Sequence, residues 1–401
     1  MQRLPVVIAG GSLSGYSTAK FLRQVGFDGP IILFGQEANL PYERPPLSKS
    51  FLLDKTQKEQ VYLTNQENLN DLNIEFMPSV LATGLDSASK KIFINNGDAI
   101  GYDALVIATG AAPKVPLGVK LDENILTFRT LEDAQRLKSA VERKNHLIIL
   151  GAGFIGVELA SSVSALGGKV TLVDMVDSPL EPVLGPEFAQ LIKAHLLDAG
   201  VVLKMGNKFK QLLSSNDEVS LIAQDDSEIL GDYCVVATGV TPQTEWVKDN
   251  HIALVNGISC NQFLQATKDV FAVGDVARFD HIGLNSSMRI EHYVNATGSA
   301  QVVAHNIVNE TPKAYLPVPY FWSEFFNIKI QMLGVSKPYD SVLIIKKGSD
   351  EIKGTVVLYS NKGKVTAIAA VSKPRLFGLV KEIVQNQVPV VEAEKIVRDL
   401  I

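Results

Sequence analysis

The apolar positions of the chain mark out one pattern twice. Residues 5–15 run from an apolar strand into small residues, and residues 146–156 repeat that arrangement. Each copy continues into a helical stretch and a second strand, at 16–25 and 31–34 in the first copy and at 157–166 and 170–173 in the second. Strand, tight turn, helix and strand in this order are typical of a βαβ unit. The repetition predicts an α/β protein with two Rossmann-like domains.

Each copy closes with an apolar strand that ends in Ala-Thr-Gly, at residues 105–110 and 234–239. The shared ending strengthens the case for a duplicated unit, because two long units with the same terminal signature rarely arise by chance. We include the closing residues in the two expected cofactor sites: Ala108, Thr109 and Gly110 in the first copy, and Gly239 in the second.

The turn of the second copy matches Gly-x-Gly-x-x-Gly at Gly151, Gly153 and Gly156. Glycine allows a tight turn and a close backbone approach to a pyrophosphate, and the N-terminus of the next helix offers N–H groups and a positive dipole end. Asp174 ends the second strand, where an acid takes the ribose hydroxyls. The series predicts a dinucleotide site formed by Gly151, Gly153, Phe154, Ile155, Gly156, Asp174 and Gly239.

The turn of the first copy departs from this rule, because Ser12 stands between Gly10 and Gly15 where the middle glycine is expected. Serine still permits backbone approach to a phosphate if its side chain points away. The ribose position is ambiguous, since Gln36 precedes Glu37 just after the second strand. A scaffold without ligand therefore stays an alternative. The candidate dinucleotide residues are Gly10, Ser12, Leu13, Ser14, Gly15, Gln36 and Glu37.

Composition removes several classes of function. The net charge of −5 gives no reason to expect nucleic-acid binding, and no stretch approaches the apolar length of a membrane span. The N-terminal apolar run lacks a signal-peptide pattern, so we expect a cytoplasmic protein. The only cysteines, Cys234 and Cys260, form no Cys-x-x-Cys pair. We therefore expect neither a dithiol redox centre nor a metal site.

Four further segments carry more specific signatures. They are Leu-Pro-Tyr-Glu-Arg-Pro-Pro-Leu-Ser-Lys at 40–49, Arg-Thr-Leu-Glu-Asp at 129–133, Val-Phe-Ala-Val-Gly-Asp-Val-Ala at 270–277 and Phe-Trp-Ser-Glu at 321–324. With these segments the chain resembles the flavin-dependent ferredoxin reductases that serve oxygenases and cytochromes P450. The resemblance implies a glutathione-reductase-like α/β fold with an FAD domain (1–112 and 241–314), an NAD domain (113–240) and a small α+β C-terminal interface domain (315–401).

The C-terminal residues support the third domain independently, because their pattern differs from both repeats. We expect strands at 329–333, 341–346, 354–359 and 365–370, followed by a helix at about 375–385.

The resemblance also implies roles for individual residues. Arg44 would hold the FAD phosphates, and Lys49 would lie beside the isoalloxazine, where its charge stabilises reduced flavin. Asp275 would bond the ribityl chain, and the residues after it would start a helix pointing at the flavin. Glu291, His292 and Tyr293 would pass the pyrimidine edge of the flavin and Trp322 would lie near it, while Ala82 and Arg129 complete the expected FAD set.

Glu158 has two interpretations. It follows Gly156 on the first helical turn, where a dinucleotide fold has no general need for an acid. The resemblance places it near the nicotinamide and within reach of Lys49, so that Lys49, Glu158 and Trp322 form the expected catalytic set. The alternative is a favourable charge–dipole contact at a helix start, worth roughly 0.3–1 kcal/mol.

Charge also decides the expected nucleotide. A 2′-phosphate needs a base near the end of the second strand, whereas a free ribose diol needs a carboxylate. Residues 174–179 contain two acids and no base, which favours NADH over NADPH.

The resemblance implies a ferredoxin-type iron–sulfur protein as electron acceptor. A ferredoxin is acidic, so we expect a local basic patch, with Arg278, Arg289, Lys329, Lys373 and Arg375 as candidates. Residues 38–60 contain no cysteine, which excludes the disulfide reductases and the peroxide-type NADH oxidases. Three alternatives remain: a redox-sensing protein similar to apoptosis-inducing factor, a diaphorase acting on small acceptors, and a scaffold that has lost its flavin.

Overall fold

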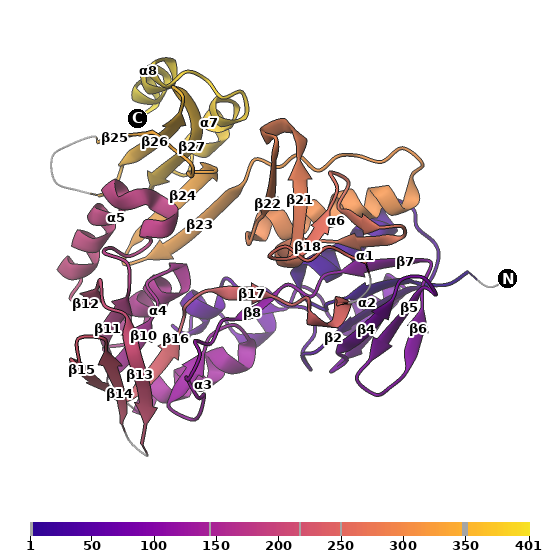
Figure 1. Cartoon of the computed structure of the whole chain (residues 1–401), viewed down its shortest axis with the longest axis horizontal. Coiled ribbons are helices and arrows are strands. Elements are labelled where there is room, and N and C mark those ends of the chain that lie inside the picture. Colours follow the sequence, from indigo (N-terminus) through magenta and orange to yellow (C-terminus); the bar gives the residue numbers. More distant parts are fainter. Residues whose placement is uncertain (1–2, 144–145, 216–217, 249–250, 347–351) are drawn as a thin grey trace. The chain divides into compact units, whose positions relative to one another are not determined.

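A computed structural model describes residues 3–143, 146–215, 218–248, 251–346 and 352–401. The chain divides into two compact units, each assembled from three segments (Figure 1). The first unit comprises Met1–Glu43, Lys58–Ala112 and Thr241–Pro319. The second comprises Arg44–Gln57, Pro113–Val240 and Tyr320–Ile401. Two of the crossings between the units fall within β8 (Ala111–Pro113) and β17 (Val240–Pro242).

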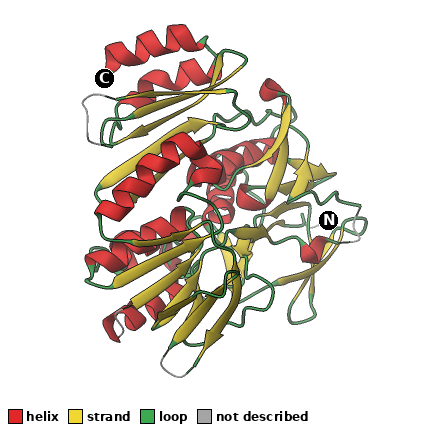
Figure 2. Ribbon diagram, turned by 60° about the vertical axis from the view of Figure 1, so that its left-hand side comes forward, coloured by secondary structure: helices red, strands yellow, loops and turns green. Residues whose placement is uncertain are grey.

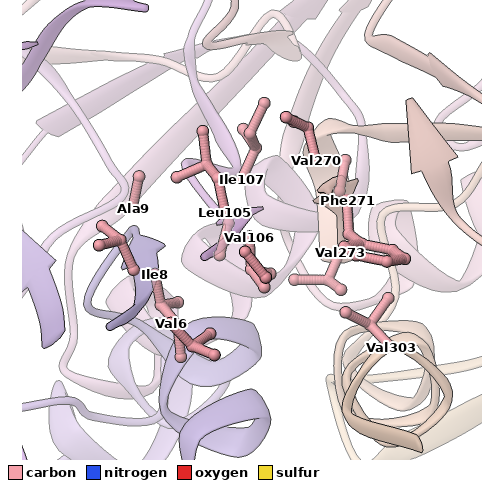
Figure 3. Packing of buried hydrophobic residues seen from close by; sticks show 14 of the residues in the cluster. Val6, Ile8, Ala9, Leu105, Val106, Ile107, Val270, Phe271, Val273 and Val303 are labelled. Carbon is pink, nitrogen blue, oxygen red and sulfur yellow. The ribbon is translucent and has the colours of Figure 1, made fainter. Parts of the chain in front are cut away.

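The first unit is built on a six-stranded sheet in the order β19-β20-β7-β1-β2-β3, parallel except for the pair β19–β20. Its strands are β1 (Val6–Ala9), β2 (Ile31–Gly35), β3 (Ile74–Pro78), β7 (Ala104–Ile107), β19 (Gln265–Thr267) and β20 (Val270–Ala272). All residues of β1 and β7 are buried, as continuous apolar runs in parallel sheets usually are. Figure 3 shows Val303 of α6 (Tyr293–Val308) beside Phe271 and Val273, in the same core as the side chains of β1 and β7.

The helix α1 (Leu13–Gln24) packs against α6. Smaller elements complete this unit: α2 (Gln66–Asp71), β4 (Ala82–Asp86), β5 (Lys91–Ile94), β6 (Ala99–Gly101), β18 (Ile258–Cys260), β21 (Ala277–His281) and β22 (Ser286–Arg289), with short helices η2 (Lys58–Val61), η3 (Glu245–Val247), η4 (Gly274–Val276) and η5 (Ile282–Leu284). The helix expected after Asp275 is wrong. A single 3₁₀ turn, η4, leads directly into β21, because the residues after Asp275 alternate between buried and more exposed positions and pair as a strand.

The second unit repeats the βαβ design in a five-stranded parallel sheet, ordered β12-β11-β10-β16-β9. Its elements are η1 (Leu47–Phe51), β9 (Ile125–Thr127), α3 (Leu131–Arg143), β10 (His146–Leu150), α4 (Phe154–Ala165), β11 (Lys169–Asp174), α5 (Glu181–Asp198), β12 (Val202–Met205), β13 (Phe209–Ser214), β14 (Val219–Ala223), β15 (Glu228–Gly231) and β16 (Tyr233–Val236). The duplicated unit predicted from the apolar pattern is therefore confirmed, and so is the α/β fold class.

The C-terminal part of the second unit is an antiparallel sheet in the order β23-β24-β27-β26-β25. Helices from the end of the chain pack on this sheet (Figure 2). The elements are β23 (Tyr320–Phe325), β24 (Ile328–Gly334), β25 (Ser341–Ile345), β26 (Val356–Asn361), β27 (Lys364–Val371), α7 (Leu376–Gln385) and α8 (Val390–Leu400). The four expected strands and the first helix are confirmed, whereas β23 and α8 were not predicted.

This C-terminal sheet stabilises a break in α5. Gly185 has φ 75° and ψ 160°, and Pro186 follows it without an N–H, so the carbonyls just before the break lose their helical donors. Two buried hydroxyls replace those donors, one just after β24 and one in β26. Ser336 donates to the carbonyl of Val183 at 2.7 Å, and Tyr359 donates to that of Leu184 at 2.6 Å.

We expect Tyr359→Phe to lower the free energy of unfolding by about 1–3 kcal/mol, because it leaves the carbonyl of Leu184 buried without a donor. Urea unfolding followed by far-UV circular dichroism measures this change. Tyr62→Phe is the control, since the half-buried Tyr62 hydroxyl donates to Asn39 at 3.0 Å and its loss should cost no more than about 0.5 kcal/mol. Equal losses of unfolding free energy in the two variants would contradict the role assigned to the Tyr359 hydroxyl at the break in α5.

Candidate dinucleotide and redox sites

The three glycines of the loop in the second unit are required for different reasons. Gly151 has φ 116°, and a Cβ there would lie 2.3 Å from the carbonyl oxygen of Ala237. A Cβ on Gly156 would lie 2.0 Å from the oxygen of Gly151. At Gly153, which precedes α4 with φ −75°, a Cβ would meet no described atom within 4 Å. The outer glycines are therefore required for folding, and the middle one leaves open space at a helix N-terminus. This cradle fits a pyrophosphate.

The loop of the first unit has the same geometry. A Cβ on Gly10 would lie 2.1 Å from the oxygen of Ala108, and one on Gly15 would lie 1.9 Å from that of Gly10. Ser12 takes the place of Gly153, in an extended conformation with φ −108° that any residue can adopt. The substitution thus falls at the one position where neither backbone nor packing demands glycine. Leu13 then begins α1, and Ser14 is buried beside Gly274.

The two units differ at the acid that follows the second strand. Leu150 pairs with Val173 in the second unit as Ala9 pairs with Phe34 in the first, so Gly35 occupies the place of Asp174. The Asp174 carboxylate accepts the N–H of Ala152 at 2.7 Å.

A side chain at Gly35 would be crowded, because a Cβ there would lie 2.9 Å from the nitrogen of Gly11. Gln36 is exposed, and Glu37 is half-buried and accepts the hydroxyl of Tyr42. The ambiguity between Gln36 and Glu37 therefore has a structural basis: the strand end itself carries no acid.

The closing tripeptides lie beside the glycine loops. The N–H of Ala108 donates to Ala9 at 2.8 Å, and that of Ala237 donates to Leu150 at 2.7 Å. Thr109 donates its hydroxyl to Gln243 at 2.9 Å. Beyond the strands Gly110 and Gly239 adopt positive φ, 64° and 98°.

Asp275 and the residues just before α6 form a cluster of polar side chains in the first unit. Arg289 is paired with Glu291 at 2.6 Å and donates to the carbonyl of Asp275 at 2.9 Å, and only 10% of its side chain is exposed. Arg289 is thus an internal cation and a poor docking residue. Burial lowers the pKa of His292 to about 4 although nearby Asp275 opposes the shift, so the ring is neutral at pH 7.

Tyr293 donates its hydroxyl to Glu43 at 2.7 Å. Burial, reinforced by that carboxylate, raises the pKa of Tyr293 to about 12, so the phenol keeps its proton at neutral pH. Ala82, another residue of the expected FAD set, is buried at the start of β4.

The second unit brings Lys49 and Glu158 together. Lys49 lies in η1, a π-helical turn that follows two prolines, and such turns often occur at functional sites. Its ammonium contacts Glu158 at 2.6 Å. Two serine hydroxyls also donate to this carboxylate, Ser48 at 2.5 Å and Ser323 at 2.7 Å. Glu158 is buried, with 5% of the residue exposed, so it makes far more than a charge–dipole contact with its own helix.

Trp322 lies on the face of β23 opposite to Ser323, since neighbouring strand residues alternate. Tyr320 stacks on it with ring centroids 6.0 Å apart, and the Lys329 ammonium lies 5.9 Å from the indole centre. Arg44 donates to the carbonyl of Arg129 at 2.7 Å, which joins two further residues of the expected FAD set. The expected site residues therefore divide between the two units, and Lys49 and Glu158 are the members of the expected catalytic set that the structure brings into contact.

Both cysteines are buried in strands, Cys234 in β16 and Cys260 in β18. Burial raises the pKa of each thiol to about 12, which keeps it protonated. Among the described residues, no cluster of three or more His, Cys, Asp or Glu side chains could hold a metal ion. Nor does the part of the chain that the structure describes contain a helix long and apolar enough to cross a membrane.

Comparison with known proteins agrees with this geometry. Residues 4–300 match the pyridine nucleotide-disulphide oxidoreductase family, and residues 320–398 match the reductase C-terminal domain. The chain belongs to the pyridine nucleotide-disulphide oxidoreductase family.

Two relatives from Pseudomonas putida cover nearly the whole chain. Putidaredoxin reductase is 30% identical over 394 residues (96% of this chain, 92% of the relative). The ferredoxin–NAD(+) reductase subunit of the benzene 1,2-dioxygenase system is 30% identical over 395 residues (98% and 94%).

Solved structures show the same similarity. The covalent complex of putidaredoxin reductase with putidaredoxin aligns with a TM-score of 0.91 and 29% identity, over 97% of this chain and 94% of that chain. The ferredoxin reductase for the CYP199A2 system from Rhodopseudomonas palustris aligns with a TM-score of 0.87 and 29% identity, over 94% and 93%.

We expect Gly153→Ala and Gly156→Ala to fail in different ways. The added methyl of Gly153→Ala enters open space, so the protein should fold with an unchanged melting temperature. The same space is the cradle expected to hold the pyrophosphate, so the methyl should weaken NADH binding at least tenfold. Gly156→Ala forces a methyl against the oxygen of Gly151, so it should lower the melting temperature or prevent folding. Differential scanning fluorimetry and NADH titration separate the two effects. Unchanged NADH affinity in Gly153→Ala would argue against a dinucleotide at this loop.

The thiols should be inert in the folded protein. At pH 8 a thiol with a pKa of about 12 is ionised in roughly one molecule in ten thousand, and both thiols are also buried. Ellman's reagent should therefore titrate both thiols after denaturation in guanidinium and essentially none before it. Rapid labelling of the native protein would refute this.

Proposed function

We propose that the chain is an NADH-dependent flavoprotein reductase that delivers electrons to a ferredoxin-type iron–sulfur protein feeding an oxygenase or cytochrome P450. The observation that carries this proposal is a combination of three features in one chain. The chain has two dinucleotide loops and the Lys49–Glu158 ion pair, and it has no redox-active cysteine pair. FAD, when bound, accepts a hydride from NADH and can pass the electrons on singly. The relatives named as reductases of putidaredoxin and ferredoxin support the same class of acceptor.

The protein's own residues bind, orient and adjust charge. Backbone N–H groups at the starts of α1 and α4 would hold the two pyrophosphates, and Arg44 would supply a cation for the FAD phosphates. Lys49 would place a positive charge beside the flavin, where it would favour the reduced form electrostatically. His292 is not a proton donor, because its lowered pKa leaves it neutral and hydride transfer needs no protein base.

Asp174 favours NADH. Its carboxylate accepts the N–H of Ala152, and it would also accept ribose hydroxyls and repel a 2′-phosphate. The next residue, Met175, is 60% exposed and offers no compensating charge. A role that depends on NADH suits the cytoplasm, where we place the protein.

Three of the candidate docking cations lie at one end of the C-terminal sheet. The N–H of Ser372 donates to the carbonyl of Lys329 at 2.7 Å, which brings Lys373 and Arg375 next to that lysine. Lys329 also lies over Trp322, although its ammonium is paired with Glu324 at 2.7 Å. A basic surface beside an aromatic residue suits an acidic electron carrier. Arg278, in β21 of the first unit, remains a further candidate.

Diaphorase activity on small acceptors is the main competing function, and a redox-sensing role similar to that of apoptosis-inducing factor is another. Both would use the same nucleotide loops and the same Lys49–Glu158 pair. They differ from a ferredoxin reductase in the acceptor alone, so the acceptor decides between them.

The purified protein should be yellow, and NADH should bleach its visible absorption under anaerobic conditions. With NADH and cytochrome c, addition of a [2Fe–2S] ferredoxin from the same source should raise the rate of cytochrome c reduction at least tenfold. Direct reduction of a quinone or ferricyanide serves as the control for diaphorase activity. A rate that does not respond to ferredoxin would refute the reductase assignment, and a colourless protein would refute the flavin assignment.

A further inference from the structure

The Glu158 carboxylate is held from three segments far apart in the chain. Its own helix, α4, supplies the carboxylate, η1 supplies Ser48 and Lys49, and β23 supplies Ser323. Ser48 and Lys49 both contact Oε2, whereas Ser323 alone donates to Oε1, at 2.7 Å. Each oxygen of the carboxylate therefore has a named donor.

Ser323 occupies a position where its residue type needs an explanation. It is 1% exposed and lies between Phe321 and Phe325, on the buried face of β23. Phe321 meets Phe154 of α4 edge to face, with ring centroids 4.8 Å apart, so this face is otherwise apolar. A buried hydroxyl in such a place is costly unless it is hydrogen-bonded, and the Glu158 carboxylate is the acceptor that the structure gives it.

Ser48 has the same character. It is 1% exposed, donates to Glu158, and its carbonyl accepts the hydroxyl of Ser162 at 2.6 Å. These two bonds, one from the Ser48 hydroxyl and one to its carbonyl, fix η1 to α4. Lys49 is the next residue, so its ammonium approaches Glu158 from a backbone that is already held in place.

We propose that Ser323 and Ser48 are positioning residues that determine how strongly Glu158 binds Lys49 and hence how much positive charge Lys49 presents to the flavin. The inference rests on the proposed function. A carboxylate that receives two hydroxyl hydrogen bonds needs less stabilisation from its lysine partner. Without Ser323 the carboxylate turns more fully to Lys49, and less of the lysine charge remains for the reduced flavin.

The position of Ser323 gives the C-terminal sheet a second role. That sheet belongs to the domain expected to meet the electron carrier, yet through Ser323 it sets the environment of a residue expected near the nicotinamide. The step from NADH to flavin should therefore depend on a residue of the C-terminal domain.

The test compares Ser323→Ala with Ser336→Ala. Ser336 is also a buried serine of the C-terminal part, and it also donates to the NAD part of the second unit, at 2.7 Å, but its acceptor is the carbonyl of Val183. The matched pair separates loss of a buried hydroxyl in general from loss of the bond to Glu158. Ser323→Thr, which keeps a hydroxyl, is the rescue variant.

Two measurements are made on each holoenzyme: the flavin midpoint potential by dye-coupled titration, and the rate of flavin reduction by NADH in an anaerobic stopped-flow instrument. In Ser323→Ala the equilibrium for flavin reduction should become about tenfold less favourable, which is ~30 mV for a two-electron couple. The limiting reduction rate should fall about tenfold. The apparent Kd for NADH should change less than about twofold. Ser323→Thr should recover most of both losses, and Ser336→Ala should match the wild type in both.

A potential and reduction rate in Ser323→Ala equal to those of the wild type would overturn the proposal, and so would equal shifts in Ser336→Ala. If Ser323→Ala does not fold, Ser48→Ala takes the same test, with a lower potential expected and an unchanged one overturning the proposal. Failure of the proposed function is distinct, because the wild type itself would then lack flavin or fail to be reduced by NADH.

Discussion

A close approach between two backbone segments in each unit is the constraint on which the rest of the structure depends. At Gly10 and Gly151 the chain leaves a buried strand and passes so close to the end of the neighbouring strand that a single methyl group would collide with a carbonyl oxygen. This crowding fixes where each helix begins, and thus where its free N–H groups point. In both units the position of the next strand and that of the Ala-Thr-Gly turn follow from it.

The sequence predicted this part of the molecule well, because its signals are local. Glycine spacing, apolar runs and the repeated tripeptide lie within short windows, and each has a direct steric meaning. Ser12 looked like a defect, but it stands where the backbone does not require glycine. By contrast, only the strand register shows which residue of the first copy corresponds to Asp174. That residue is Gly35, so the first copy has no acid at this position.

Residues that act together across long separations were harder to predict. The resemblance to a known family suggested Lys49 and Glu158, but nothing in the sequence pointed to Ser48 or Ser323 as their partners. A serine between two phenylalanines could be a strand residue on either face until β23 is recognised as a strand, and the Phe-Trp-Ser-Glu segment lacks a clear alternation. The helix expected after Asp275 was wrong for a related reason, since tertiary pairing with β22 decided the conformation there.

The division of each unit into three chain segments has a consequence for synthesis on the ribosome. The central sheet of the first unit contains β7, complete at Ile107, beside β20, which begins only at Val270. In the second unit, Ser48 emerges long before Glu158, and Ser323 comes last. Neither unit can complete its fold from the N-terminal part of the chain as that part is synthesised. The early strands therefore keep unpaired edges until their neighbours have been made. We therefore expect truncated chains to be prone to aggregation and production of the enzyme to depend on chaperones during translation.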